Sequence, residues 1–128
     1  MRKISILGST GSIGVNALSV IRNMPEKFKI VHLTGNLNYT KMIDQGKEFL
    51  PQTITMIDEE AAERVKIGLQ DFNIDIFSGR NKLLDLSGDR QVDLVLNSLV
   101  GASGMEPTLT ALQNGVDVAL SNKESLVV

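Results

Sequence analysis

Three glycines spaced three residues apart, Gly8, Gly11 and Gly14, mark the first chemically informative stretch of the chain, G-S-T-G-S-I-G. This stretch follows an apolar run at residues 4–7, as expected for a loop between a strand and a helix. There, Gly8 permits a tight turn, Gly11 lets the backbone approach a ligand, and Gly14 allows close packing of the helix. A helix N-terminus offers unpaired N–H groups and a partial positive charge, so the loop predicts a pyrophosphate site for a dinucleotide.

The same loop carries three hydroxyl groups, on Ser9, Thr10 and Ser12, which are candidate donors to the phosphates. Its spacing differs by one residue from the Gly-x-Gly-x-x-Gly fingerprint, and no Gly-Lys-Ser/Thr follows, which excludes a P-loop. The simpler alternative is a turn whose glycines serve only backbone angles. The agreement of strand, loop and helix favours dinucleotide binding.

The end of the second predicted strand should select the cofactor. An acidic residue there binds the ribose hydroxyls of NAD, whereas a cation accommodates the 2′-phosphate of NADP. The segment reads Asn36-Leu37-Asn38 and contains neither a carboxylate nor an arginine; Lys41 is the nearest cation. The absence of negative charge favours NADP.

A second polar cluster, Ser121-Asn122-Lys123-Glu124, follows the last predicted strand. It should lie at the carboxyl edge of the sheet, where the glycine loop also lies. An amide, a cation and a carboxylate together could orient a phosphorylated substrate there. The same residues fit the Ser-x-x-Glu capping box, and the sequence leaves both interpretations open.

Other polar residues suggest structural roles. His32, the only histidine, lies inside a predicted strand and is expected to be a packed or edge residue rather than a base. The acidic run at residues 58–60 is expected to open a helix, where carboxylates complement the helix dipole. No cluster of metal-ligating residues is apparent.

The elements that position these residues alternate between strand and helix patterns. The first helix should present Ile13, Ala17, Val20, Ile21 and Met24 on one face and end before Pro25. This order predicts an α/β fold: a Rossmann-like, doubly wound, mainly parallel sheet with helices on both faces. Strands are expected at residues 4–7, 28–33, 53–57, 74–77, 94–97 and 116–120, and helices at 13–24, 39–50, 62–72, 81–86 and 107–114.

The composition bounds the protein class. The 128 residues carry a formal net charge of −2, no cysteine and 42% hydrophobic residues, as a globular domain does. Near-neutral charge disfavours nucleic acid as a partner, and no apolar run is long enough to cross a membrane. The apolar end at residues 125–128 leads us to expect one domain of a longer protein.

Taken together, the motifs resemble the 1-deoxy-D-xylulose 5-phosphate reductoisomerase family. The similarity comprises G-S-T-G-S-I-G at residues 8–14, V-G-A-S-G at 100–104 with P-T at 107–108, and N-K-E-S-L-V at 122–127. It spans the whole chain, and the pairing of the first motif with the last is specific. The resemblance implies an N-terminal NADPH-binding domain, with residues 1–128 forming a single dinucleotide-binding domain.

The family resemblance also implies an activity. The enzyme isomerises deoxyxylulose phosphate with a divalent metal, Mg or Mn, and reduces the product with NADPH to methylerythritol phosphate, in non-mevalonate isoprenoid biosynthesis. The metal ligands, catalytic residues and substrate-phosphate site are expected beyond Val128, so this chain alone should bind cofactor without turnover. The substrate is a small sugar phosphate, and a homodimer in the bacterial cytoplasm is expected.

The resemblance assigns roles to particular positions. Lys123 faces the substrate. The residues expected to bind NADPH are Gly8, Thr10, Gly11, Ser12, Ile13, Asn36, Leu37, Asn38, Asn122 and Glu124. One departure stands out: the family shows Gly-Lys/Arg-Asn after the second strand, and Leu37 replaces that basic residue, with Lys41 one helical turn further.

The sequence leaves two alternative functions open. A semialdehyde-type dehydrogenase has a similar first loop, Gly-Ala-Thr-Gly, and would need a catalytic cysteine outside this chain. A nucleotide-sensing Rossmann module would bind the cofactor without chemistry.

Overall fold

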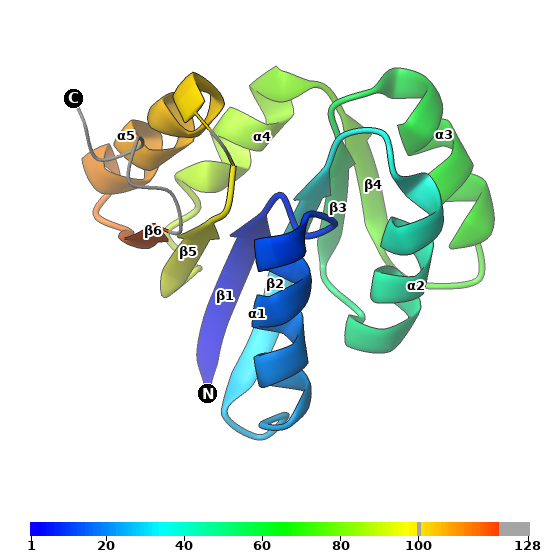
Figure 1. The fold of residues 1–128 in the computed structure, drawn as a ribbon, viewed down its shortest axis with the longest axis horizontal. Helices are drawn as coiled ribbons and strands as arrows, with labels where there is room; N and C mark the ends of the chain where they lie inside the picture. Colours follow the sequence, from blue (N-terminus) through cyan, green and yellow to red (C-terminus); the bar gives the residue numbers. More distant parts are fainter. Residues whose placement is uncertain (100, 121–128) are drawn as a thin grey trace.

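The computed structural model describes residues 1–99 and 101–120, which form a layered α/β domain (Figure 1). The strands are β1 (Arg2–Leu7), β2 (Phe28–Gly35), β3 (Thr53–Met56), β4 (Asp75–Ser78), β5 (Leu94–Asn97) and β6 (Asp117–Leu120). The helices are α1 (Ser12–Arg22), α2 (Tyr39–Phe49), α3 (Glu59–Gly68), α4 (Arg80–Ser87) and α5 (Met105–Gln113), with a short 3₁₀ turn η1 (Gly101–Gly104).

The six strands form one sheet in the order β4-β3-β2-β1-β5-β6, and all neighbouring pairs are parallel. The chain runs outward from β1 to β4, then crosses back so that β5 pairs with β1. The strand order therefore reverses between β1 and β5, and ligands of doubly wound sheets bind at the carboxyl side of such a reversal. The predicted fold class is confirmed.

Helices cover both faces of the sheet, as two separate apolar clusters demonstrate. One cluster joins the sheet to α1, α2 and α3 through residues such as Leu18, Met42 and Val65. The other joins the opposite face to α4 and α5 through Leu83 and Ala111. Figure 1 shows α2 and α3 side by side near β3 and β4, with α5 beside β6.

The apolar pattern located the helices but misjudged one face and several ends. Of the residues predicted to face the core from α1, Ile21 is buried, whereas Ile13 and Val20 are 41% and 56% exposed; Leu18, which was not predicted, is buried. Helix α3 ends at Gly68 rather than near Phe72, and Phe72 packs against the core from the following turn. Apolar spacing defines the buried face of a helix only to within about one residue. Packing against the sheet therefore decides which side chains are buried.

The start of α3 was predicted more accurately than the buried face of α1. Asp58 caps α3 by accepting a hydrogen bond from the Ala61 N–H at 2.9 Å, with Glu59 and Glu60 in the first turn. The prediction that this acidic run opens a helix is confirmed. Nothing in residues 1–99 or 101–120 forms a helix long and apolar enough to traverse a lipid bilayer.

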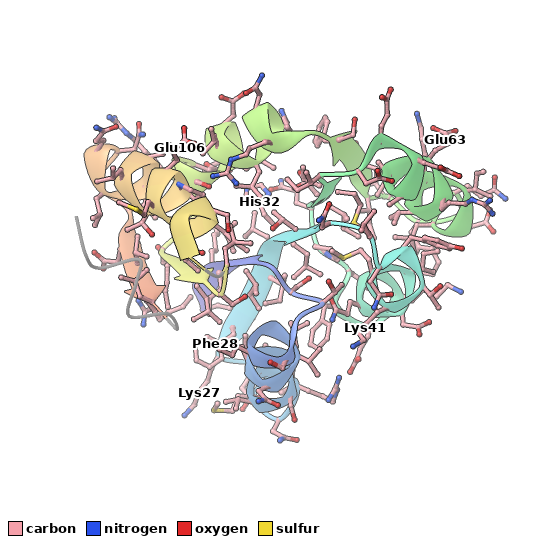
Figure 2. The ribbon with its side chains drawn as sticks, turned by 45° about the horizontal axis from the view of Figure 1, so that its top comes forward. Lys27, Phe28, His32, Lys41, Glu63 and Glu106 are labelled. Atoms are coloured by element: carbon pink, nitrogen blue, oxygen red, sulfur yellow. The ribbon has the colours of Figure 1, made fainter. Side chains whose placement is uncertain are left out.

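His32 is a packed residue, as expected, and it is 2% exposed (Figure 2). Its Nδ1 lies 2.7 Å from Thr53 Oγ1, and its Nε2 lies 2.7 Å from Asp89 Oδ2. Burial raises the pKa of the Asp89 carboxyl, but hydrogen bonds from His32 and the Gln91 N–H outweigh it and hold that pKa below its ordinary value. The imidazole thus links β2 and β3 to the segment between α4 and β5.

Candidate functional site

The glycine loop lies between β1 and α1, at the carboxyl edge where the strand order reverses. Gly8 has φ +79°, a left-handed conformation that favours glycine. Its N–H donates to Thr34 on β2, at 3.0 Å to Oγ1 and 3.1 Å to the carbonyl. On the other side, the Ser98 hydroxyl after β5 bridges the Leu7 and Gly8 carbonyls. The turn is therefore fixed by both neighbours of β1.

Gly14 is required by the packing of α1 against the loop. A Cβ at this position would lie 2.5 Å from the Gly8 carbonyl oxygen and 2.6 Å from the Ser9 Cα. Both are backbone atoms that cannot rotate away. The absent side chain brings the first turn of α1 directly onto the loop.

Gly11 is different, because the protein itself leaves room there. A Cβ would meet only the Gly8 carbonyl oxygen, at 3.6 Å, and φ and ψ of −76° and 170° suit any residue. Gly11, Ser12 and Ile13 are all exposed. The bare backbone at Gly11 therefore faces outward, where a ligand could approach it.

The N-terminus of α1 is available to an anion. In the part of the chain that the structure describes, no side chain caps this helix and its first turn holds no acidic residue. The first-turn N–H groups of an α-helix have no partner within the helix. Together with the helix dipole, they form a site that favours a phosphate.

Ser9 does not serve as the ligand donor that the sequence suggested. Its side chain is fully buried, and Oγ donates to Gln45 Oε1 at 2.8 Å, while Gln45 Nε2 donates to the Ser9 carbonyl at 2.9 Å. The hydroxyl therefore anchors the loop to α2. Thr10, half-buried, and Ser12, exposed, remain as hydroxyl donors of this loop.

The predicted cofactor-selecting segment follows β2 at the same edge. Asn36 and Leu37 are exposed, and Leu37 is 64% exposed although it is apolar. Asn38 is the N-cap of α2, since its Oδ1 accepts a hydrogen bond from the Lys41 N–H at 3.1 Å. This oxygen is committed to the helix, and the Asn38 residue is exposed.

Lys41 extends from α2 back to the glycine loop. Its Nζ lies 3.5 Å from the Thr10 carbonyl oxygen, and Figure 2 shows the residue between α1 and α2. The tertiary structure thus brings together the glycine loop and the first turn of α2. Sequence analysis identified Lys41 only as the nearest cation along the chain.

A small cavity adjoins this segment, and no residue of the glycine loop lines it. Its volume is about 230 Å³, and its lining residues are Leu37, Tyr39, Asp58, Glu60, Ala61 and Arg64. The Arg64 guanidinium stands over the Tyr39 ring, 5.7 Å from the centroid, where a cation–π contact is favourable. The cavity therefore offers apolar and aromatic surface with both signs of charge at its rim.

The loop after β5 completes the reversal point. Asn97 is fully buried, and its Nδ2 donates to the Gly104 carbonyl and to Thr108 Oγ1, both at 2.8 Å. It holds the start of α5 against the end of β5. The Arg80 guanidinium supports the same loop by donating to the Ser103 carbonyl at 2.8 Å.

Sequence reasoning missed Thr34, Gln45 and Ser98, which support the glycine loop, and Asn97, which holds the start of α5. Thr34, Asn97 and Ser98 lie at the carboxyl end of β2 or β5, where a polar residue after an apolar run is the available signal. Which loop they support could not be read from the chain, because it depends on β2 and β5 flanking β1.

Several predicted residues lie outside the described part of the chain. Asn122, Lys123 and Glu124, with the expected cap Ser121, fall there, and their roles stay predictions. Within residues 1–99 and 101–120, no three His, Cys, Asp or Glu side chains come together as a metal site.

Comparison with known proteins identifies relatives along the whole chain. Residues 4–128 match the family described as 1-deoxy-D-xylulose 5-phosphate reductoisomerase. Proteins of that name from Laribacter hongkongensis and Glaesserella parasuis are each 40% identical, over 100% and 99% of this chain respectively. In both cases the chain spans only 33% of the relative's length.

Solved structures that resemble this chain carry the same family name. A crystal structure of DOX-P reductoisomerase with NADPH, fosmidomycin and magnesium has a TM-score of 0.92 and 35% identity, covering 99% of this chain and 31% of that one. The reductoisomerase of Zymomonas mobilis in complex with NADPH has a TM-score of 0.91 and 29% identity, covering 98% of this chain and 33% of that one.

Proposed function

The chain belongs to the 1-deoxy-D-xylulose 5-phosphate reductoisomerase family, and we propose that it is the domain through which such an enzyme binds NADPH. The observation that carries the proposal is the uncapped N-terminus of α1 behind the open Gly11, at the point where the strand order reverses. A pyrophosphate suits this place in charge and in shape. The two structural relatives described above are complexes with NADPH.

The proposed contacts divide by chemical type. The N–H groups of Ser12 and Ile13 and the hydroxyls of Thr10 and Ser12 bind the pyrophosphate. Gly11 contributes a backbone without a side chain, so that the phosphates can come close, and Gly8 is proposed to contact the cofactor through the turn that it makes.

Asn36, Leu37 and Asn38 lie at the end of β2, where the adenosine ribose of a dinucleotide binds. The side-chain amide of the exposed Asn38 can donate to a ribose or phosphate oxygen. Asn122 and Glu124 are proposed to contact the cofactor, and Lys123 the substrate.

The activity of the whole enzyme is part of the proposal. It isomerises deoxyxylulose phosphate and reduces the product with NADPH to methylerythritol phosphate, in non-mevalonate isoprenoid biosynthesis. The chain spans about a third of the length of its relatives. We therefore propose that this chain supplies the cofactor domain, residues 1–128, and that the sugar phosphate and most of its contacts involve other parts of the enzyme.

A divalent metal, Mg or Mn, would assist the isomerisation, and one solved relative contains magnesium together with NADPH. The described residues fit such an ion poorly, because they bring together no cluster of His, Cys, Asp or Glu. We propose that its ligands are not among them. A homodimer in the bacterial cytoplasm completes the proposal.

Titration of the 128-residue chain with NADPH, followed by calorimetry and nucleotide fluorescence, tests the function. Saturable binding is expected, with no oxidation of NADPH when deoxyxylulose phosphate and Mg²⁺ are added. Absence of binding at millimolar NADPH would contradict the proposal. Addition of deoxyxylulose phosphate and Mg²⁺ to a full-length enzyme carrying this domain should oxidise NADPH, and replacement of Lys123 by Ala should lower that rate.

The two alternatives are not favoured by the relatives. The family match and both curated relatives carry the reductoisomerase name, not that of a semialdehyde dehydrogenase. A purely sensing module would bind NADPH equally well, and turnover in the full-length assay would exclude it.

A further inference from the structure

We propose that Lys41 makes this site prefer NADPH to NADH by pairing with the 2′-phosphate of the adenosine. This inference rests on the proposed NADPH-binding function and assigns its specificity to a residue of α2. Leu37, exposed just after the end of β2, carries no charge. Another cation must neutralise the phosphate if NADPH is preferred.

The backbone geometry places Lys41 correctly for this role. Its N–H is fixed by Asn38 Oδ1 at 3.1 Å, so the first turn of α2 is held against the segment that follows β2. From there the side chain reaches the Thr10 carbonyl, with Nζ at 3.5 Å. The ammonium thus lies between the glycine loop and the end of β2, which in a doubly wound fold flank the pyrophosphate and the ribose.

The ammonium is free to take an anion. A 3.5 Å contact is at the outer limit of a hydrogen bond. The ion pairs found among residues 1–99 and 101–120 join Arg22 to Glu48, His32 to Asp89 and Arg80 to Glu106, and none uses Lys41. An exposed cation without a carboxylate partner keeps its charge for a ligand.

Lys41 also lies where helix stability disfavours it. It is the third residue of α2, and the positive end of the helix dipole repels a cation in the first turn. Among the described residues its side chain makes no other hydrogen bond and no ion pair. The residue therefore contributes little to the stability of the fold. Binding of an anionic ligand explains a lysine at this position better than helix stability does.

Arg64 is the rival cation and is less suited to the role. It lines the cavity beside Leu37 together with Asp58 and Glu60, and its guanidinium is stacked on Tyr39. Two carboxylates at that rim would repel a phosphate dianion. Lys41 is not among the residues that line this cavity, and its Nζ lies next to the glycine loop.

The test compares the dissociation constants of NADPH and NADH for the 128-residue chain and its variants. Lys41→Met should weaken NADPH about tenfold, the effect of one lost charged hydrogen bond, and should leave NADH unchanged. Lys41→Arg should retain the preference. Lys47→Met, in the last turn of the same helix, is the matched control and should change neither constant.

The outcomes separate this inference from the proposed function. If the unmodified chain binds neither nucleotide, the proposed function fails. If it binds both with equal affinity, or if Lys41→Met weakens both equally, Lys41 does not read the 2′-phosphate and the inference fails. A selective loss with Arg64→Met and none with Lys41→Met would also overturn it. Thermal unfolding midpoints should stay close to that of the unmodified chain for the Lys41 and Lys47 variants, because both side chains are exposed.

Discussion

Gly14 and Ser9 are separated by so little space that a Cβ on Gly14 would lie 2.6 Å from the Ser9 Cα. This contact seats the first turn of α1 on the glycine loop and directs the N–H groups of that turn toward the carboxyl edge of the sheet. The three glycines of one motif consequently do different things. Gly8 makes the turn, Gly14 brings the helix onto it, and Gly11 leaves the outer side open.

Replacing Gly14 with Ala should damage the fold. The new methyl group would overlap backbone atoms of Gly8 and Ser9 that cannot move independently, and we expect a loss of about 3 kcal/mol in the free energy of unfolding. Urea denaturation followed by circular dichroism measures the loss. A Gly14→Ala variant as stable as the unmodified chain would show that α1 can shift without cost.

Replacing Gly11 with Ala should damage binding instead. The methyl group meets the protein only at an ordinary contact distance of 3.6 Å, so the free energy of unfolding should fall by no more than about 1 kcal/mol. The dissociation constant for NADPH should rise at least about tenfold, since the methyl group occupies the approach of the pyrophosphate. Unchanged affinity, measured by calorimetry, would place the phosphates elsewhere.

Replacing Leu37 with Arg should strengthen NADPH relative to NADH. Leu37 is 64% exposed at the end of β2, so the longer side chain fits without repacking and adds a cation near the ribose. We expect the NADPH dissociation constant to fall about tenfold, with that of NADH unchanged. Ile67→Arg adds the same charge to an exposed position on α3 and is the control. Equal gains for both nucleotides would mean that Leu37 is remote from the 2′ position.

The Asp89 carboxyl should make the free energy of unfolding depend on pH in the acidic range. Its pKa lies below the ordinary value of 3.8, because the hydrogen bond from His32 and that from the Gln91 N–H outweigh the effect of burial, which raises it. Between these two pKa values the unfolded chain binds more protons, so the free energy of unfolding rises with pH there. The stabilisation is fully present above the ordinary pKa and is lost as pH falls through the lowered one.

Asp89→Asn should remove this acid-sensitive stabilisation. At neutral pH the variant is expected to be less stable by about 1 kcal/mol, and the difference should shrink as the pH falls below 3.8. Asp71→Asn, at an exposed position, is the control for loss of a carboxylate. A difference that is constant with pH, in urea denaturation series, would show that His32 does not favour the charged carboxylate.

Thr55 and Thr34 are paired across β3 and β2, and their hydroxyls should respond oppositely to replacement by Val. Thr55 is fully buried, and its Oγ1 has no hydrogen-bond partner in residues 1–99 and 101–120. Thr55→Val should therefore stabilise the protein by about 1 kcal/mol. Thr34 Oγ1 accepts from the Gly8 N–H, so Thr34→Val should destabilise it by a similar amount. Thermal unfolding compares the two, and the prediction is wrong if both variants shift the midpoint in the same direction.

Local signals predicted most of the elements. The strand and helix positions followed from apolar spacing, and the helix that starts at Glu59 followed from its acidic opening. Errors arose where packing against another element, rather than spacing along the chain, determines which side chains are buried. Val20 fits the apolar stripe of α1 by spacing, but the sheet buries Leu18 instead, since side-chain orientation depends on how the helix is rotated against its neighbours.

By itself the sequence determined the order of strands and helices, the glycine loop and the family resemblance, because each depends on residues that are close along the chain. The tertiary structure decided how the loop is supported. It paired β1 with β2 and β5, so that Thr34 and Ser98 hold Gly8 from opposite sides, and it buried the Ser9 hydroxyl against Gln45. It also brought Lys41 to Thr10. These contacts join residues 26 to 90 positions apart, and no local pattern encodes which distant strands become neighbours.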